Sequence, residues 1–386
     1  MSRLAAIVAI LTAAMLLLAA AGTLRAAEKS SARKKPLLTS RPAKPATPAK
    51  PARPAASRRP MPAVPKAPAT TAAGWPVPQP KKALREITHL KRTYVDLLDL
   101  AARYGFKSAT KKSGKDFLLT LTTPRSETLV FTERQPFCQI AGIQASLSFP
   151  VIVNHGRFYL EKTDFTELLE PLLQTAKLPR RTIQHIVVDA GHGGKDQGAA
   201  RGKFLEKDLN LLMARKVASI LRKRGYKVSM TRNGDTTLTL DQRCSFAESK
   251  KADLFLSIHT NAMESPDGNG IEVYVANPPG VPSVGTTNIG KQGKATPFQR
   301  TSALWGFFTQ RALLKATGAE DRGLRRKQFK VIIDTPAPAM LVEIGYLSNE
   351  KERAKLQRAD YQDSLAVAIC DGIDQLRNAV KPQKAR

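Results

Sequence analysis

Two histidines and one glutamate stand at the edges of predicted regular elements, in a pattern typical of a catalytic metal site. His192 lies in a glycine-rich loop that directly follows the β-branched run His185–Asp189. Glu206 begins a long amphipathic stretch, and His259 follows the apolar run Ala252–Ile258. Two imidazoles and one carboxylate suit zinc, and three protein ligands leave the fourth tetrahedral position open for water. We therefore expect a Zn²⁺ site at His192, Glu206 and His259.

Glu343 is the candidate general base. Zinc lowers the pKa of a bound water towards 7, and amide hydrolysis also needs a group that carries the water's proton to the leaving nitrogen. Glu343 ends the otherwise apolar run Met340–Glu343, where burial should raise the pKa of a carboxyl group. A capping or salt-bridged carboxylate is the alternative interpretation.

Four more residues have two open interpretations each. Asp189 is expected either to orient a metal ligand or to cap a strand end. Asn261, just after His259, is expected to contact substrate or to stabilise the turn. Arg232 and Arg243 are expected to hold substrate carboxylates or to form structural ion pairs. The glycines around His192 lack the spacing of a phosphate-binding loop, so we expect them to turn the backbone tightly and aim that histidine.

The elements that must position these residues alternate along residues 181–380, the predicted catalytic domain. The expected strands are His185–Asp189, Lys227–Thr231, Leu254–Ile258, Gly270–Val275, Lys330–Ile333 and Met340–Glu343. The expected helices are Lys207–Arg224, Leu240–Ser249, Thr301–Ala316 and Asn349–Leu376. This alternation predicts an α/β fold, a mostly parallel sheet with helices on both faces. Ligands of such sheets bind beyond the carboxyl ends of the strands, where His192, His259 and Glu343 fall.

Residues 84–176 are predicted to form a separate, small α+β module. Helical spacing over Leu90–Tyr104 is followed by several short strand patterns, and a second helix is expected from Thr163 to Leu173. The pattern resembles the small domain named after the N-terminal region of copper amine oxidases. That resemblance implies a binding or spacing role without copper chemistry.

The N-terminal part of the chain predicts export. Residues 1–26 contain Arg3 and then an apolar run with small residues at its end, which is typical of a signal peptide, or of a membrane anchor if it is not cleaved. Residues 27–83 are rich in Pro, Ala, Lys and Arg and predict a disordered cationic linker. We expect a periplasmic or cell-envelope location, either free or membrane-anchored.

The basic charge of the chain predicts anionic partners. The formal net charge is +30, and the linker carries a large share of it. Anionic envelope polymers or a membrane surface are candidate partners, unless the linker is a solvated spacer with no specific partner. Nucleic acid is not an expected partner, because export would separate the protein from it. The sequence also lacks basic stretches interleaved with aromatic residues, which are typical of nucleic-acid binding.

Residues 184–378 resemble the zinc-dependent N-acetylmuramoyl-L-alanine amidases of the third class of bacterial cell-wall amidases. The matching stretches are Val187–Gly194, Glu206–Asn210, Thr231–Arg232, Leu240–Arg243, Ala252–Ala262, Gly270–Tyr274 and Leu341–Asn349. The resemblance implies that His192, Glu206 and His259 bind zinc and that Glu343 is the catalytic glutamate. It implies peptidoglycan as the substrate, cleaved between N-acetylmuramic acid and L-alanine. A zinc peptidase acting on cell-wall peptides and a non-catalytic wall-binding regulator are the alternatives.

The sequence departs from part of that family in one segment. Some members carry an inserted helix whose glutamate plugs the zinc until an activator removes it. In this chain the stretch Val273–Ala319 contains no Asp or Glu, so no carboxylate plug can come from it. We expect activity that this mechanism does not gate.

Overall fold

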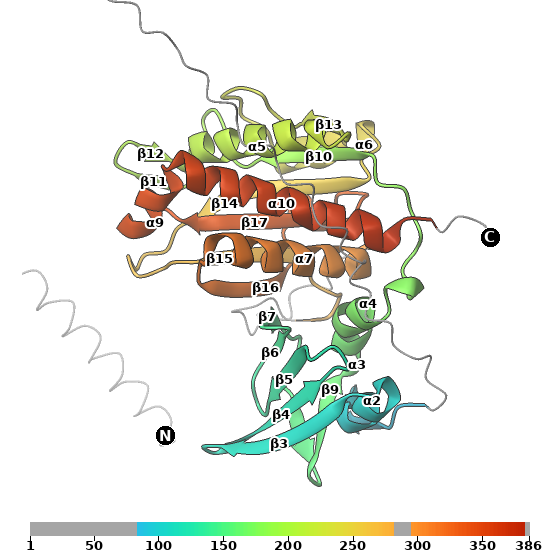
Figure 1. Cartoon of the computed structure of the whole chain (residues 1–386). Coiled ribbons are helices and arrows are strands. Elements are labelled where there is room, and N and C mark those ends of the chain that lie inside the picture. The colour runs from blue at the N-terminus through green and yellow to red at the C-terminus, as the bar shows by residue number, and fades with distance from the viewer. Residues whose placement is uncertain (1–82, 282–294, 383–386) are drawn as a thin grey trace, which may run out of the picture. The chain divides into compact units, whose positions relative to one another are not determined.

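The computed structural model describes residues 83–281 and 295–382 (Figure 1). The predicted signal peptide or anchor at 1–26 lies outside the described residues, and so does the predicted linker at 27–83 apart from its last residue. Among the helices of the described ranges, none has both the length and the apolar content to cross a bilayer.

The main sheet has 11 strands, which come from both halves of the described chain. In spatial order the first six are β13 (Lys227–Met230), β10 (His185–Ala190), β14 (Leu254–Asn261), β17 (Ala339–Tyr346), β15 (Ile271–Ala276) and β16 (Asp321–Lys327). The sheet continues with β7 (Ile143–Ser146), β6 (Phe137–Ile140), β5 (Thr128–Thr132), β4 (Asp116–Thr122) and β3 (Lys107–Ser113). Every residue of β10 and β15 is buried. Strands covered on both faces are mostly apolar, which explains the apolar runs Ile186–Val188 and Val273–Ala276.

The prediction of a mostly parallel sheet is wrong, because the sheet is mixed. β13, β10, β14 and β17 run parallel, but β15 lies antiparallel to β17. Residues 262–270 are the whole connection from β14 to β15, and a return in the same direction needs a crossover of about a dozen residues or more. The pairings from β7 to β3 are all antiparallel as well.

Helices cover both faces of the C-terminal half of this sheet. α5 (Glu206–Lys223), α7 (Gln299–Thr317) and α10 (Ala359–Val380) bury their apolar sides in the larger core, and α7 and α10 lie side by side (Figure 1). α6 (Leu240–Ser249) and α8 (Lys330–Ile333) pack into a smaller core on the opposite face. His259 and Glu343 therefore stand on strands, β14 and β17, that helices cover on both faces.

Two predicted elements differ in the structure. Lys330–Ile333 is the helical turn α8 instead of a strand, because Lys330 pairs with Asp334 across one turn (2.8 Å) and Thr335 donates to the Val331 carbonyl (2.7 Å). The predicted helix Asn349–Leu376 is two helices, α9 (Glu350–Leu356) and α10, interrupted at residues 357–358.

Residues 83–177 form a second, smaller sheet beside the strands that they add to the main one. It contains β1 (Glu86–His89), β2 (Arg92–Asp96), β9 (Arg157–Glu161) and β8 (Ile152–Asn154), with α2 (Leu97–Tyr104), α3 (Lys162–Asp164), the π-helical turn η1 (Phe165–Leu169) and α4 (Glu170–Leu173). The predicted helix Leu90–Tyr104 is wrong before Leu97, because Asp96 caps the helix there. Its carboxylate accepts from the backbone N–H groups of Leu98 (2.8 Å) and Asp99 (3.1 Å).

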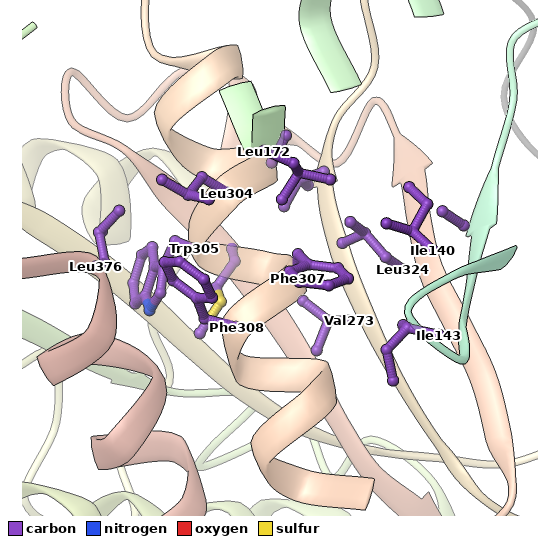
Figure 2. Packing of buried hydrophobic residues seen from close by; sticks show 14 of the residues in the cluster. Ile140, Ile143, Leu172, Val273, Leu304, Trp305, Phe307, Phe308, Leu324 and Leu376 are labelled. Carbon is purple, nitrogen blue, oxygen red and sulfur yellow. The ribbon is translucent and has the colours of Figure 1, made fainter. Parts of the chain in front are cut away.

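The two halves of the described chain share one core. β7 pairs with β16 at Ala145 and Leu324, and Ile140, Leu172 and Phe307 pack around that junction (Figure 2). Two residues after Leu324 on β16, the buried Arg326 forms an ion pair with the buried Asp164 of α3. The same carboxylate accepts from the Ser148 backbone N–H (2.8 Å).

Candidate metal centre

His192 is held by its loop in an unusual backbone conformation. The loop leaves β10 at Ala190, and His192 has a φ of +59°, which non-glycine residues adopt infrequently and often at functional sites. Two buried guanidinium groups fix the turn. Arg232 donates to the carbonyls of Ala190 and Gly191 (both 2.9 Å), and Arg243 donates to those of Ala190 (2.8 Å) and His192 (2.9 Å).

The structure brings the three predicted metal ligands together. Glu206 Oε1 lies 3.2 Å from His192 Nε2 and 3.0 Å from His259 Nδ1. The three ligand atoms all lie within 4.8 Å of one another. Ligands about 2.1 Å from one tetrahedral ion lie about 3.4 Å apart. The two nitrogens and one oxygen therefore fit a zinc-like cation in both spacing and chemistry.

Glu206 is held in place from several sides. It is the first residue of α5, and its Oε1 accepts from Asn210 Nδ2 (3.1 Å) and the Thr260 N–H (3.2 Å). Its Oε2 accepts from the Ala199 N–H (2.9 Å). On the other side of His192, Asp196 Oδ2 lies 2.8 Å from Nδ1, which orients the ring and leaves Nε2 facing the centre.

Two glycines leave room for the ligands. A Cβ on Gly191 would lie 2.3 Å from the His259 ring, and one on Gly198 would lie 2.5 Å from Glu206 Oε2 and 2.7 Å from the His192 ring. Real Cβ atoms essentially never approach other atoms so closely. The glycine-rich loop is therefore needed for the close approach of the ligands as well as for its turn.

Glu343 shares a cleft with two of the three ligands, His192 and His259. It stands opposite His259 in the register of β17 and β14. Both line a cleft of about 440 Å³ whose other wall is largely apolar. That wall consists of Leu238, Leu240, Phe329, Val331 and Leu341. Glu343 Oε2 is buried without a hydrogen-bond partner within the described part of the chain, so it is available to a group that enters the cleft.

The carboxyl groups of Glu206 and Glu343 are shifted in opposite directions. Burial alone would raise the pKa of Glu206, but hydrogen bonds from His192 and His259 outweigh it and hold that pKa far below its usual value. Burial raises the pKa of Glu343 well above its usual value, and the charges of Glu206 and Glu272 add to that rise. The site therefore contains one carboxylate that stays ionised and one that holds a proton readily.

Three of the predicted site residues, Asp189, Arg232 and Arg243, use their side chains for hydrogen bonds to other residues of the protein. Asp189 is fully buried and accepts from Arg243 (2.6 Å), Thr231 (2.6 Å) and Ser257 (2.8 Å). Arg232 is 4 % exposed and Arg243 is 3 % exposed, and the contacts of both include the carbonyls of the His192 loop. Asp189 and Arg243 also reach the cleft wall.

Asn261 contacts the buried carboxylate of Glu272. Its Nδ2 donates to Glu272 Oε1 (2.5 Å), which also accepts from Tyr346 (2.8 Å), while Arg325 pairs with the other carboxylate oxygen of Glu272 (2.8 Å). Glu272 stands opposite Glu343 in the register of β15 and β17.

Sequence reasoning missed three residues around the centre, although each had a signal. Asn210 lies four residues after Glu206, on the same helix face. Asp196 lies four residues after His192, in the same loop. Glu272 is an acid inside an apolar strand, which is the signal that singled out Glu343.

Comparisons with known proteins agree on the C-terminal half of the chain. The family model for N-acetylmuramoyl-L-alanine amidase matches residues 186–375. The amidase LytC of Bacillus subtilis is 36% identical over 187 residues, which are 48% of this chain and 34% of LytC. YqiI of Bacillus subtilis, a protein named as uncharacterized, is 32% identical over 189 residues, which are 49% of this chain and 82% of YqiI.

A solved structure matches the same half. It is the catalytic domain of the N-acetylmuramoyl-L-alanine amidase CwlV from Bacillus (Paenibacillus) polymyxa var. colistinus. The identity is 40%, the match covers 50% of this chain and 96% of that domain, and the TM-score is 0.43. The chain thus spans most of YqiI and of the CwlV domain but only about a third of LytC.

Proposed function

Since the chain belongs to the N-acetylmuramoyl-L-alanine amidase family, we propose that it hydrolyses the amide bond between N-acetylmuramic acid and L-alanine in peptidoglycan. One observation carries this proposal. Two imidazoles and an ionised carboxylate meet within 4.8 Å, beside a second carboxyl group that lines the same cleft. A non-catalytic wall-binding protein would not need this combination.

Zinc is the proposed ion, held by His192, Glu206 and His259. When bound, it would act as a Lewis acid that polarises the substrate carbonyl and makes water a stronger acid. The protein's own contribution is a preformed ligand set. Asp196 orients the ring of His192, and Asn210 with Thr260 fixes the carboxylate of Glu206.

Glu343 is the proposed proton carrier. It would accept a proton from the attacking water and donate it to the nitrogen of the departing L-alanine. Its position opposite His259 and its unpartnered Oε2 support this role. The apolar wall of the cleft would keep bulk water from the reacting groups.

Asp189, Arg232 and Arg243 are proposed to act through the His192 loop instead of on substrate. Their hydrogen bonds run to loop carbonyls and to one another, which supports the structural alternative for both arginines. Asn261 is proposed to anchor the end of β14 to Glu272.

The other parts of the chain have proposed roles that follow from their composition. Residues 1–26 would direct export or anchor the protein in a membrane, and 27–83 would be a cationic linker able to contact anionic envelope polymers or a membrane surface. Residues 84–176 would be a binding or spacing module, and 181–380 the zinc amidase domain. The acid-free stretch Val273–Ala319 supports activity without a carboxylate plug.

Digestion of purified sacculi tests the reaction. Wild-type protein loaded with zinc is expected to release free stem peptides and leave glycan strands intact, as identified by mass spectrometry, and Glu343→Ala protein is expected to release none. Cleavage only within peptides would replace the proposal with a zinc peptidase. No release by either protein would favour a wall-binding regulator.

The expectation that the activity needs no activator is tested by a zinc titration of purified protein that spans residues 83–382. Activity is expected to rise with bound zinc and to reach its plateau at one ion per chain. An inactive, fully loaded protein that only a partner activates would contradict this expectation.

A further inference from the structure

β16 ends in Lys327, whose ammonium group has no acidic partner among the described residues. The other cationic side chains near it each form an ion pair with a carboxylate. These pairs are Arg322 with Glu320 (3.6 Å), Arg325 with Glu272 (2.8 Å), Arg326 with Asp164, and Lys330 with Asp241 and Asp334 (both 2.8 Å). Lys327 forms no ion pair with any carboxylate of the described residues. The segment 282–294, which could have supplied one, contains no Asp or Glu.

The ammonium group of Lys327 lies on two aromatic rings instead. Its Nζ is 4.7 Å from the centre of the Phe329 ring and 5.8 Å from that of Tyr274. The two rings contact each other edge to face at 5.1 Å. A cation–π contact holds an ammonium group without neutralising it, so Lys327 keeps a positive charge available for an anion.

This charge lies beside the catalytic cleft. Phe329, on which the ammonium group rests, lines the cleft together with Leu341 and Glu343. Tyr274 stands opposite Leu341 in the sheet register, on the face that also presents Glu343. From Glu343 the order along this face is therefore first Leu341 with Tyr274, and then Lys327.

The spacing along that face matches a short peptide. Leu341 and Glu343 are two residues apart, which is about 7 Å along a strand. An extended peptide advances about 3.3–3.6 Å per residue. A stem peptide whose reacting amide lies at Glu343 and which extends along β17 would therefore bring its second residue to the level of Leu341 and Tyr274. Lys327 stands opposite Ala276, two residues beyond Tyr274 on the next strand, and its ammonium group reaches back to 5.8 Å from the centre of the Tyr274 ring. In stem peptides the second residue carries a carboxylate.

We propose that Lys327, held by Tyr274 and Phe329, binds the free carboxylate of the second stem-peptide residue and thereby determines specificity for unamidated peptidoglycan. The inference rests on the proposed amidase function. It assigns a substrate preference to a side chain that none of the proposed catalytic steps uses.

The kinetic test compares two muramyl tripeptides, one with a free carboxylate on the second residue and one with that group amidated. Lys327→Met is expected to raise KM for the free acid about tenfold and to leave KM for the amide unaffected. Because the Lys327 charge lowers the pKa of Glu343, any change of kcat should be the same for both substrates. Lys327→Arg should restore most of the preference. Lys250→Met is the matched control, because Lys250 also lies on a ring, Phe246 at 5.2 Å, but does not line the cleft.

A binding test separates this inference from the proposed function, because it needs no turnover. Calorimetry measures the free-acid and amidated stem peptides against zinc-loaded Glu343→Gln protein, with and without Lys327→Met. About tenfold weaker binding of the free acid alone supports the lysine site even if wild type proves unable to hydrolyse sacculi. The inference would be overturned if Lys327→Met weakened binding of the acid and the amide equally, or weakened neither. It would also be overturned if inorganic phosphate, and not the free-acid peptide, were the only anion that competes for the Lys327 site.

Discussion

Among single side chains, Glu343 offers the sharpest test of the site. Glu343→Gln keeps the shape but removes the proton carrier, so the release of stem peptides should fall by about 10²- to 10⁴-fold. The stability of the fold should stay the same or rise, because a buried carboxyl group beside two other acids becomes a neutral amide. Sacculus digestion and thermal unfolding measure the two effects. Glu248→Gln on the exposed face of α6 is the control, and a large loss of stability in Glu343→Gln would contradict the assignment.

Removal of the metal should inactivate the protein without unfolding it. The ligands are held by protein contacts, Glu206 by Asn210 and Thr260 and His192 by Asp196. Such a site differs from small zinc domains, which fold only with metal. Chelator-treated protein is expected to keep its far-UV circular dichroism, to melt at a lower temperature and to regain activity with added zinc. Loss of secondary structure on chelation would show that the ligands are not preorganised.

At the scale of elements, the loop after β10 should be intolerant of even one added methyl group. Gly191→Ala would place a Cβ 2.3 Å from the His259 ring. The ring must move, so zinc affinity should fall by about tenfold or more while the sheet persists. Calorimetric zinc titration measures this. Gly234→Ala is the matched loop control, since its nearest neighbour would be 4.0 Å away. Equal zinc affinities of the two variants would refute the argument.

The ion pair beneath that loop should be important for stability. Arg243→Met leaves Asp189 as a buried, uncompensated charge, which is expected to cost about 3–5 kcal/mol of unfolding free energy. The double variant with Asp189→Asn should cost less than the sum of the single changes. Urea unfolding measures both. Removal of the exposed pair Arg358–Asp360 should change nothing measurable, and additive losses at Asp189 and Arg243 would count against coupling.

Sequence patterns predicted the strand before His192 and the helix after Glu206 better than the segment Lys330–Ile333, for a physical reason. The strand before His192 and the helix after Glu206 have long, strongly periodic apolar patterns, and packing reinforces that local preference. The β-branched run Val331–Ile333 favours a strand locally, but a lysine–aspartate pair and a threonine bond close it into a helical turn. The direction of β15 could not be predicted from its own residues, because the length of its connection decides it.

For the molecule as a whole, the sequence does not foretell that one sheet runs through both predicted domains. The composition around residues 176–181 suggests a boundary, yet β7 joins β16 and the larger core includes residues of both halves. Only three-dimensional contacts show this, because Asp164 and Arg326 are far apart in sequence. The domain limits 84–176 and 181–380 therefore stay predictions about the origin and role of each part. They do not mark two parts with separate cores.

A shortened chain that begins at residue 181 tests this continuity. Without the first half, Arg326 loses its buried carboxylate, and Leu324 and Phe307 lose the apolar partners Ile140 and Leu172 that cover them (Figure 2). β16 also becomes an exposed strand edge, which favours association between chains. The shortened protein should melt about 10 °C below the chain that begins at residue 83, and it should form aggregates in size-exclusion chromatography. Because the metal ligands lie several strands away from β16, its monomeric fraction should still bind zinc. A monodisperse shortened protein with an unchanged melting temperature would mean that the first half docks on the amidase domain without supporting its fold.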